Sequence, residues 1–180
     1  MKKILILLVA LLLVGCNLVE STAPTDIASS FLDSLKSMDF EKAKTVSDEA
    51  LTEKIRELET VTTRDASAEA MIKKLLHLFD YQILSEEISG ESATVVIKIQ
   101  GLSEAALTKL GSDVMQAGLS VVDPSNKEEV SQAVLAALET LDVTTLERQE
   151  RELTLSLIKD GRDWRLTEDT LSRLTDALLP

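Results

Sequence analysis

The sequence is poor in the residue types that disulfides and most metal sites require. Its 180 residues contain one cysteine and one histidine. A single cysteine cannot form a disulfide within the chain, so the fold must depend on its apolar core. One histidine and one cysteine also leave few ligands for a metal site, and no cofactor is expected. Aromatic residues make up only 3% of the chain, which argues against a carbohydrate-binding face of stacked rings.

Basic residues are scarce relative to acidic ones. The chain has 19 Lys and Arg against 31 Asp and Glu, which gives a formal net charge of −12. A surface of this sign repels nucleic acids and anionic lipid head groups, so we expect neither to bind through a basic patch. The sequence also contains no glycine-rich phosphate loop and no serine in a nucleophile elbow. It shows no catalytic constellation, and we expect a protein that is not an enzyme.

A long hydrophobic run is present only at the N-terminus. The apolar run Ile4–Val14 follows the pair Lys2-Lys3. Its 11 residues are too few for a membrane-spanning helix, which needs about 20, but they suit the apolar segment of an export signal. The run ends at Leu13-Val14-Gly15-Cys16, and this tetrapeptide resembles the lipobox of bacterial lipoproteins.

The lipobox resemblance implies that the Cys16 thiol receives diacylglycerol and that residues 1–15 are removed. The protein would then be anchored to the cell membrane on its extracytoplasmic side, or to an outer membrane if the cell has one. Two acyl chains hold a protein firmly, whereas one holds it only marginally. Loss of Lys2-Lys3 with the leader changes the formal net charge from −12 to −14. The alternative is an ordinary secretory signal followed by an incidental cysteine.

The rest of the chain is expected to form a short tether and one domain. Residues 16–25 hold the lipidated N-terminus, and their small polar residues and Pro24 are typical of a linker. Residues 26–180 suit a single domain of ordinary size. Apolar residues at helical spacing predict three amphipathic helical segments before residue 80. These are expected to begin at Thr25 or Asp26, after Ser47 and after Asp65.

Two hairpins and three more helices are predicted in the second half of the chain. Alternation of apolar and polar residues indicates a first hairpin over residues 81–88 and 92–100, with Gly90 in a loop of two or three residues. In the second hairpin, a two-residue Asp160-Gly161 loop would pair Leu157 with Trp164. Residues 103–141 hold two helices, and a last helix follows the second hairpin. The expected caps of these three helices are Ser103, Ser125 in a capping box with Glu128, and Thr167.

Helices grouped before and between antiparallel strands indicate an α+β fold, with amphipathic helices packed on a curved antiparallel sheet of about four strands. The segment Met38-Asp39-Phe40-Glu41-Lys42-Ala43 resembles the opening helix of nuclear-transport-factor-2-like (cystatin-like) domains. The ending Ile158-Lys159-Asp160-Gly161, followed by Trp164-Arg165-Leu166, resembles their last strands. The resemblance implies a cone-shaped fold with a pocket, which many relatives use to bind ligands or other chains and some use for catalysis. Residues 103–141 would be a helical insertion relative to minimal members.

Polar residues before the second hairpin supply the candidate ligand site. If the first strand of that hairpin extends backwards, Arg151 and Gln149 lie on the helix-facing side of the sheet. A buried charge there needs a partner or a polar ligand. These two residues would line the pocket mouth, with Tyr81 and Trp164 as aromatic walls. The simpler alternative begins the strand at Leu153, leaves the charges in solvent and places Trp164 in the core.

Other polar residues are expected to have no special role. His77 lies on the helical face opposite the apolar residues, so we expect it to be exposed. The acid pairs Glu86-Glu87 and Glu128-Glu129 are expected to be solvated. General acid–base work by two carboxylates depends on their distance in space, which the sequence does not give.

These patterns together predict a non-catalytic binding module that is held at the membrane by lipid on Cys16. Its partner would be a small or peptide-like ligand, or another protein of the cell envelope. Two alternatives stay open. The first is a pocket enzyme of the hydrolase or isomerase type that uses carboxylates, and the second is an interaction module that forms a homodimer through its sheet.

Overall fold

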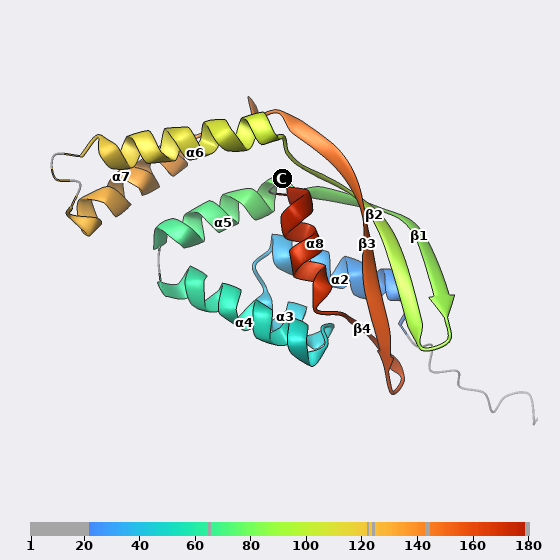
Figure 1. Cartoon of the computed structure of the whole chain (residues 1–180). Coiled ribbons are helices and arrows are strands. Elements are labelled where there is room, and N and C mark those ends of the chain that lie inside the picture. Colours follow the sequence, from blue (N-terminus) through green and yellow to red (C-terminus); the bar gives the residue numbers. More distant parts are fainter. Residues whose placement is uncertain (1–21, 65, 122, 124, 143–144, 179–180) are drawn as a thin grey trace, which may run out of the picture.

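The structure, a computed structural model, describes residues 22–64, 66–121, 123, 125–142 and 145–178. Within these residues, seven helices accompany one four-stranded antiparallel sheet, and helices cover one face of it (Figure 1). The predicted α+β fold class is therefore confirmed. The lipobox Leu13-Val14-Gly15-Cys16 lies outside the described residues. In the described part of the chain, no helix has the length and apolar character needed to cross a membrane.

The helices begin close to the predicted positions. Pro24 lies in the first turn of α2, where a missing backbone N–H costs nothing, so the helix begins before the predicted cap and Ala23 is its N-cap residue. Ser103 caps α6 as predicted, whereas α7 is capped by Asn126, one residue after Ser125. The helices are α2 (Pro24–Lys36), α3 (Phe40–Thr45), α4 (Glu49–Arg64), α5 (Ala66–Leu78), α6 (Glu104–Leu119), α7 (Lys127–Thr140) and α8 (Asp169–Leu178).

The sheet has the strand order β1-β2-β3-β4. Its strands are β1 (Asp80–Ser89), β2 (Ser92–Leu102), β3 (Arg148–Asp160) and β4 (Asp163–Leu166). In the first hairpin Ser89 pairs with Ser92, which leaves a two-residue loop with Gly90 first. This settles the loop length that the sequence left open.

The register of the second hairpin differs from the prediction. Leu157 pairs with Leu166 rather than with Trp164, and the loop is Gly161-Arg162. Gly161 has a φ of +64°, and a turn with glycine first needs positive φ only there, whereas an Asp160-Gly161 loop would need it at both residues. The partner of each residue moves by two positions, so the same side chains still face the helices.

The main core lies between the sheet and α2. Residues 93, 95, 97 and 99 of β2 are buried, as are Leu155 and Leu157 of β3. They pack with Phe31 and Leu32 of α2, both of which are 0% exposed. Full burial of each such side chain contributes about 1.5–3 kcal/mol. The alternation predicted for both hairpins therefore sets the face on which the helices pack.

A second, smaller core joins the α6–α7 helical pair to the rest of the domain. Its buried residues are Leu78, Leu102, Ala106, Leu110 and Leu138. The pair extends from the end of the sheet and lies beside α5 (Figure 1). The two helices that were predicted within residues 103–141 are thus present, and α5 lies between the two cores.

Candidate functional site

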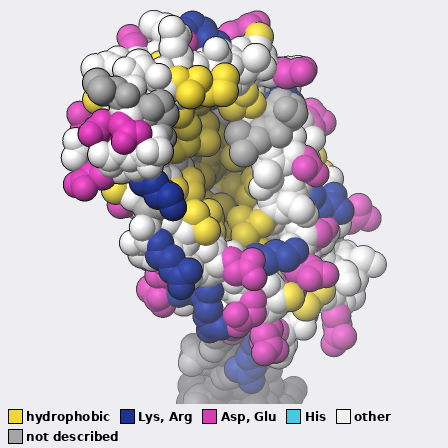
Figure 2. Space-filling model, turned by 60° about the vertical axis from the view of Figure 1, so that its left-hand side comes forward, with side chains coloured by type: hydrophobic (Ala, Val, Ile, Leu, Met, Phe, Trp, Pro, Cys, Tyr) yellow, Lys and Arg dark blue, Asp and Glu magenta, His cyan; other side chains and the backbone are white. Residues whose placement is uncertain are grey.

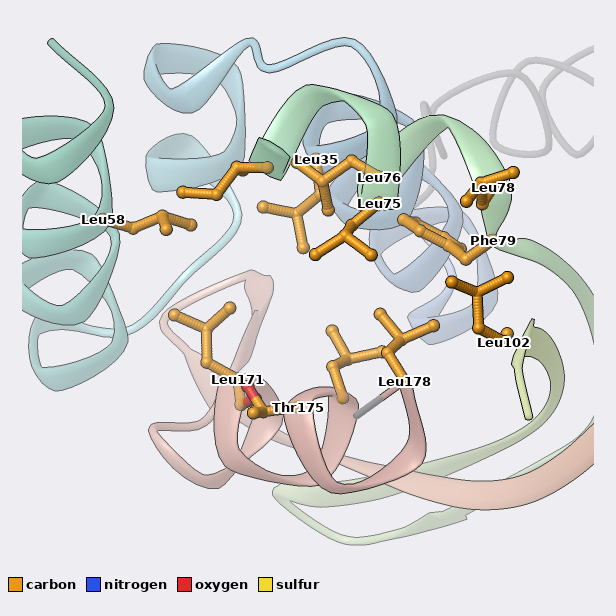
Figure 3. A pocket seen from close by; sticks show the side chains of 13 residues that line it. Leu35, Leu58, Leu75, Leu76, Leu78, Phe79, Leu102, Leu171, Thr175 and Leu178 are labelled. Carbon is orange, nitrogen blue, oxygen red and sulfur yellow. The ribbon is translucent and has the colours of Figure 1, made fainter. Parts of the chain in front are cut away.

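An apolar cavity of about 150 Å³ lies between α4, α5, α8 and the C-terminal end of β2. Figure 2 shows a hollow in this side of the molecule in which hydrophobic side chains gather. Nine leucines line the cavity, together with Ile72, Phe79, Gly101 and Thr175. Figure 3 shows Leu75 and Leu76 on one side, Leu171 and Leu178 facing them, and Leu58 at one end. The cavity is therefore a candidate site for an apolar ligand.

The cavity exists because α5 carries more apolar surface than its neighbours cover. Leu76 packs against the main core, while Met71 and Leu75 pack against the second core. Of the residues within this helix only Leu78 is fully buried, and Ile72, Leu75 and Leu76 keep part of their surface open. The sequence shows a wide apolar stripe here, but it does not show that the stripe is divided between two cores with a gap between them.

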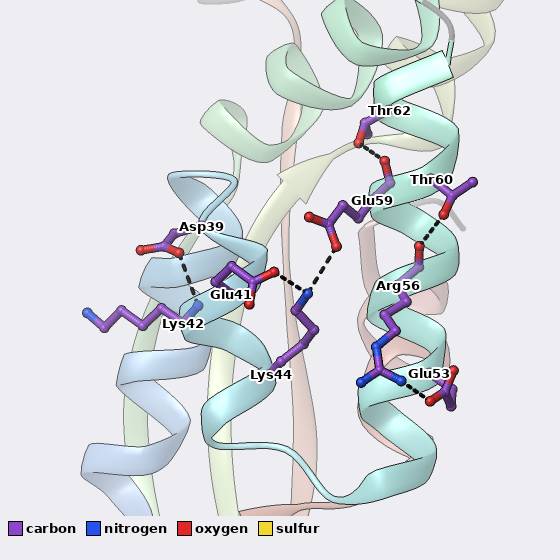
Figure 4. Close-up of polar contacts among 9 residues, drawn as sticks. All are labelled: Asp39, Glu41, Lys42, Lys44, Glu53, Arg56, Glu59, Thr60 and Thr62. Atoms are coloured by element: carbon purple, nitrogen blue, oxygen red, sulfur yellow. Dashed lines mark hydrogen bonds and ion pairs between the residues drawn. The ribbon is translucent and has the colours of Figure 1, made fainter.

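The buried Leu51 and Ile55 hold α4, which also supplies Leu58 to the cavity, in the main core, and a polar bridge joins this helix to α3 (Figure 4). The Lys44 ammonium lies 2.5 Å from Glu41 Oε1 on α3 and 3.1 Å from Glu59 Oε2 on α4. Hydrogen bonds to these two carboxylates raise the pKa of Lys44 above its ordinary value. Glu59 adjoins Leu58, so this bridge lies next to one wall of the cavity.

The cavity lining contains almost no polar side chains. Its one side-chain hydroxyl, on Thr175, donates to the Leu171 carbonyl oxygen at 2.8 Å. None of the described lining residues has an ionisable side chain. A ligand would thus be held by apolar contact alone, and the cavity walls offer no group for general acid–base catalysis.

The structure places Arg151 and Gln149 on the inner face of a long β3. This strand begins at Arg148, so the longer of the two predicted strands is correct and the alternative start at Leu153 is wrong. Arg151 pairs with the fully buried Ile99. Its guanidinium donates to the Ala177 carbonyl oxygen and to Gln149 Oε1, both at 2.7 Å. Arg151 is therefore bonded to protein groups, and neither it nor Gln149 lines the cavity.

Tyr81 and Trp164 also lie away from the cavity lining. The Tyr81 hydroxyl donates to Asp33 Oδ1 at 2.8 Å, and burial, followed by this bond, raises the pKa of Tyr81 to about 12. Trp164 is 3% exposed and belongs to the main core, with the Lys159 ammonium 5.5 Å from the centre of its ring. The four predicted ligand residues are not gathered around this cavity, and a ligand-binding role for them stays a prediction.

His77 and the two acid pairs show no arrangement that would form a site. His77 is exposed, as expected. Glu86 accepts a hydrogen bond from the Thr25 N–H at 2.9 Å, and Glu129 accepts one from the Asn126 amide at 2.9 Å. Across the described residues, no group of three or more His, Cys, Asp or Glu could hold a metal ion.

Comparison with known proteins gives little further guidance. No protein-family model matches the sequence, and no curated protein matches it. The fold is similar to the crystal structure of a candidate lipoprotein (ycdA) from Bacillus subtilis, with 16% sequence identity and a TM-score of 0.47. The match covers 87% of this chain and 47% of that one, so this chain spans about half of that protein's length. A likeness this distant supports no conclusion about function, and the nuclear-transport-factor-2-like resemblance stays a prediction.

Proposed function

We propose that this protein is a lipid-anchored extracytoplasmic lipoprotein that binds an aliphatic ligand in the leucine-lined cavity without chemical turnover. The observation that carries the proposal is the lining itself, in which 11 of 13 residues are Leu, Ile or Phe. Apolar cavities of this size accept small apolar molecules. An aliphatic group that enters gains the dispersion contacts that the walls lack when the cavity is empty.

The lipobox-like Leu13-Val14-Gly15-Cys16 supports attachment to a membrane through Cys16. The extracytoplasmic side follows from the same signal, because the acyl chains are added to exported proteins at the outer face of the cytoplasmic membrane. The tether then ends at the start of α2.

The geometry of α2 supports a ligand that arrives from the aqueous side. Near its start, the Thr25 N–H bonds Glu86 of β1, and at its end Leu35 lines the cavity while Lys36 bonds Asp80. The 12 residues from Pro24 to Leu35 span about 17 Å of helix. The start of α2 therefore lies at the end of this helix that is farther from the cavity.

The two alternatives receive less support. A carboxylate enzyme would need acids in its pocket, and the cavity lining carries none. A sheet-mediated dimer would need an apolar outer face. That face carries polar residues such as Thr94, Gln100 and the ion pair of Lys98 with Glu150, 3.3 Å apart, beside the apolar Val96 and the exposed Ile158. A binding module fits both observations.

The test is to fill the cavity without removing any wall. In the mature chain with Cys16→Ser, we expect Leu58→Phe to weaken binding of hexyl β-D-glucoside, whose six-carbon chain matches the cavity volume, by about tenfold or more, equivalent to about 1.4 kcal/mol. The matched control is Val61→Phe, which adds the same ring to α4 at a residue that is 51% exposed. Isothermal titration calorimetry measures both affinities. Equal affinities for the two variants would contradict binding in this cavity.

A further inference from the structure

The last turn of α8 forms one wall of the cavity and is tied to the sheet by a single arginine. Leu178 of this turn lines the cavity. The neighbouring Ala177 carbonyl oxygen accepts a hydrogen bond from Arg151 Nη1 at 2.7 Å. Carbonyl groups in the last turn of a helix have no partner within the helix, and a cationic side chain there satisfies one and favours the helix dipole. Arg151 thus holds the wall from outside the cavity.

Gly101 of β2 lets this wall lie close to the sheet. A Cβ atom at position 101 would lie 3.0 Å from Leu178 Cδ2 and 3.4 Å from Leu178 Cα. Gly101 and Leu178 both line the cavity. An alanine at 101 would therefore displace the Leu178 side chain and take up space in the cavity.

The volume limits what can enter. Apolar cavities of about 150 Å³ hold a molecule the size of benzene, so about six carbon atoms fit here. Two acyl chains side by side do not fit. The dry lining, with its one hydroxyl already bonded to Leu171, leaves a polar head group outside in solvent.

We propose that the cavity accepts the end of one alkyl chain and that Arg151 is a positioning residue, which sets the chain-length limit by holding the last turn of α8 over Gly101. This inference rests on the proposed function, because it assumes that the cavity binds an aliphatic ligand. It gives Arg151 a role that needs no contact with the ligand.

The experiment measures chain-length profiles with neutral alkyl β-D-glucosides of four to twelve carbons, used below their micelle concentrations, with each affinity determined by isothermal titration calorimetry. For the mature chain with Cys16→Ser, affinity should rise about fourfold per methylene while carbons are being buried. It should then stop rising at the chain length that fills the cavity, near six carbons, and this chain length is called the break. Gly101→Ala should move the break to a shorter chain, and Arg151→Met should move it to a longer one.

Two further variants make the profiles interpretable. Arg162→Met removes the same charge in the β3–β4 loop, where the side chain is exposed, and should keep the break of the parent. Arg151→Lys can still donate to the Ala177 carbonyl, so it should restore the parent break. If Arg151→Met does not fold, Arg151→Gln takes its place: it also removes the charge, its side chain is shorter, and it should likewise move the break to a longer chain.

The outcomes separate the two proposals. Absence of binding for every glucoside by the parent protein would overturn the proposed function itself. Normal parent binding, with variants that lower the affinity for all chain lengths by one common factor, would overturn the positioning role and leave the proposed function standing. A break at a shorter chain in Gly101→Ala and at a longer chain in Arg151→Met supports both the proposed function and the positioning role of Arg151.

Discussion

Tyr81, the only tyrosine in the chain, is half-buried on β1, and its hydroxyl donates to Asp33 on α2. The Ser29 carbonyl oxygen lies 3.4 Å from the same hydroxyl. Burial disfavours the phenolate, and the nearby Asp33 carboxylate disfavours it further, so the pKa rises from 10 to about 12. Tyr81 thus joins β1 to α2 by a hydrogen bond and does not line the cavity.

A pH prediction follows from the raised pKa of Tyr81. The folded protein holds the phenol proton more tightly than the unfolded chain does. The resulting contribution to stability is complete below pH 10 and is lost as the pH rises to about 12. We expect the phenolate absorbance of the folded protein to have its midpoint near 12 and Asp33→Asn to lower that midpoint.

Tyr81→Phe is the control for the stability effect. It should flatten the fall in the free energy of urea unfolding between pH 10 and about 12 relative to wild type. A wild-type midpoint at the ordinary tyrosine value would show that the Asp33 bond and the burial do not exist in solution.

The junction of β2 with α6 depends on Ser103, which is 9% exposed. Its hydroxyl accepts from the Ala106 N–H at 3.2 Å, so it caps α6, and it donates to Glu147 Oε2 at 3.1 Å. Its backbone N–H donates to the Glu147 carbonyl oxygen at 2.9 Å. One residue therefore starts a helix and ties the second core to the segment that leads into β3.

We expect Ser103→Ala to lower the free energy of unfolding by about 1 kcal/mol, with a range of about 0.5–2, because the helix loses its cap. Urea denaturation followed by the fluorescence of the single tryptophan measures the change. Ser112→Ala, at an exposed site within α6, is the control and should be neutral or slightly stabilising. A loss no larger than that of the control would mean that α6 does not depend on this cap.

The proposed anchor gives a prediction for the protein in its cell. Cys16 is the only cysteine, so Cys16→Ser removes the only thiol that diacylglycerol could modify. The wild-type protein should incorporate labelled fatty acid and fractionate with membranes, because two or more acyl chains hold a protein firmly. The variant should incorporate no label and leave the membrane fraction. A Ser21→Ala variant, changed in the tether, should behave as wild type.

The same experiment addresses the alternative that residues 1–15 are an ordinary secretory signal. In that case both wild type and Cys16→Ser would be found free of the membrane. The acidic mature domain, with a net charge of −14 once Lys2-Lys3 are lost, would not bind anionic membranes by itself.

Much of the fold follows from local patterns. Alternation in residues 92–100 and 152–158 identified the two central strands, and glycines at 90 and 161 identified the turns. These features are local because side-chain direction in a strand repeats every two residues, and positive φ is cheap only for glycine. The predicted residue pairing in the second hairpin was wrong. Both Asp160-Gly161 and Gly161-Arg162 can form a two-residue loop, and the sequence does not decide between them.

The candidate site was decided by tertiary structure. Arg151, a predicted ligand residue, does not line this cavity and donates to the Ala177 carbonyl. The sequence could not show this contact, since nothing in it shows where α8 ends against the sheet. The cavity draws its lining from α2, α4, α5, β2 and α8, and a gap between elements depends on how far apart they pack. The sequence alone determined the α+β class and the excess of acidic residues, and it predicts an export signal. Only the packing of α5 between two cores left a leucine-lined space, because packing is a property of several segments at once.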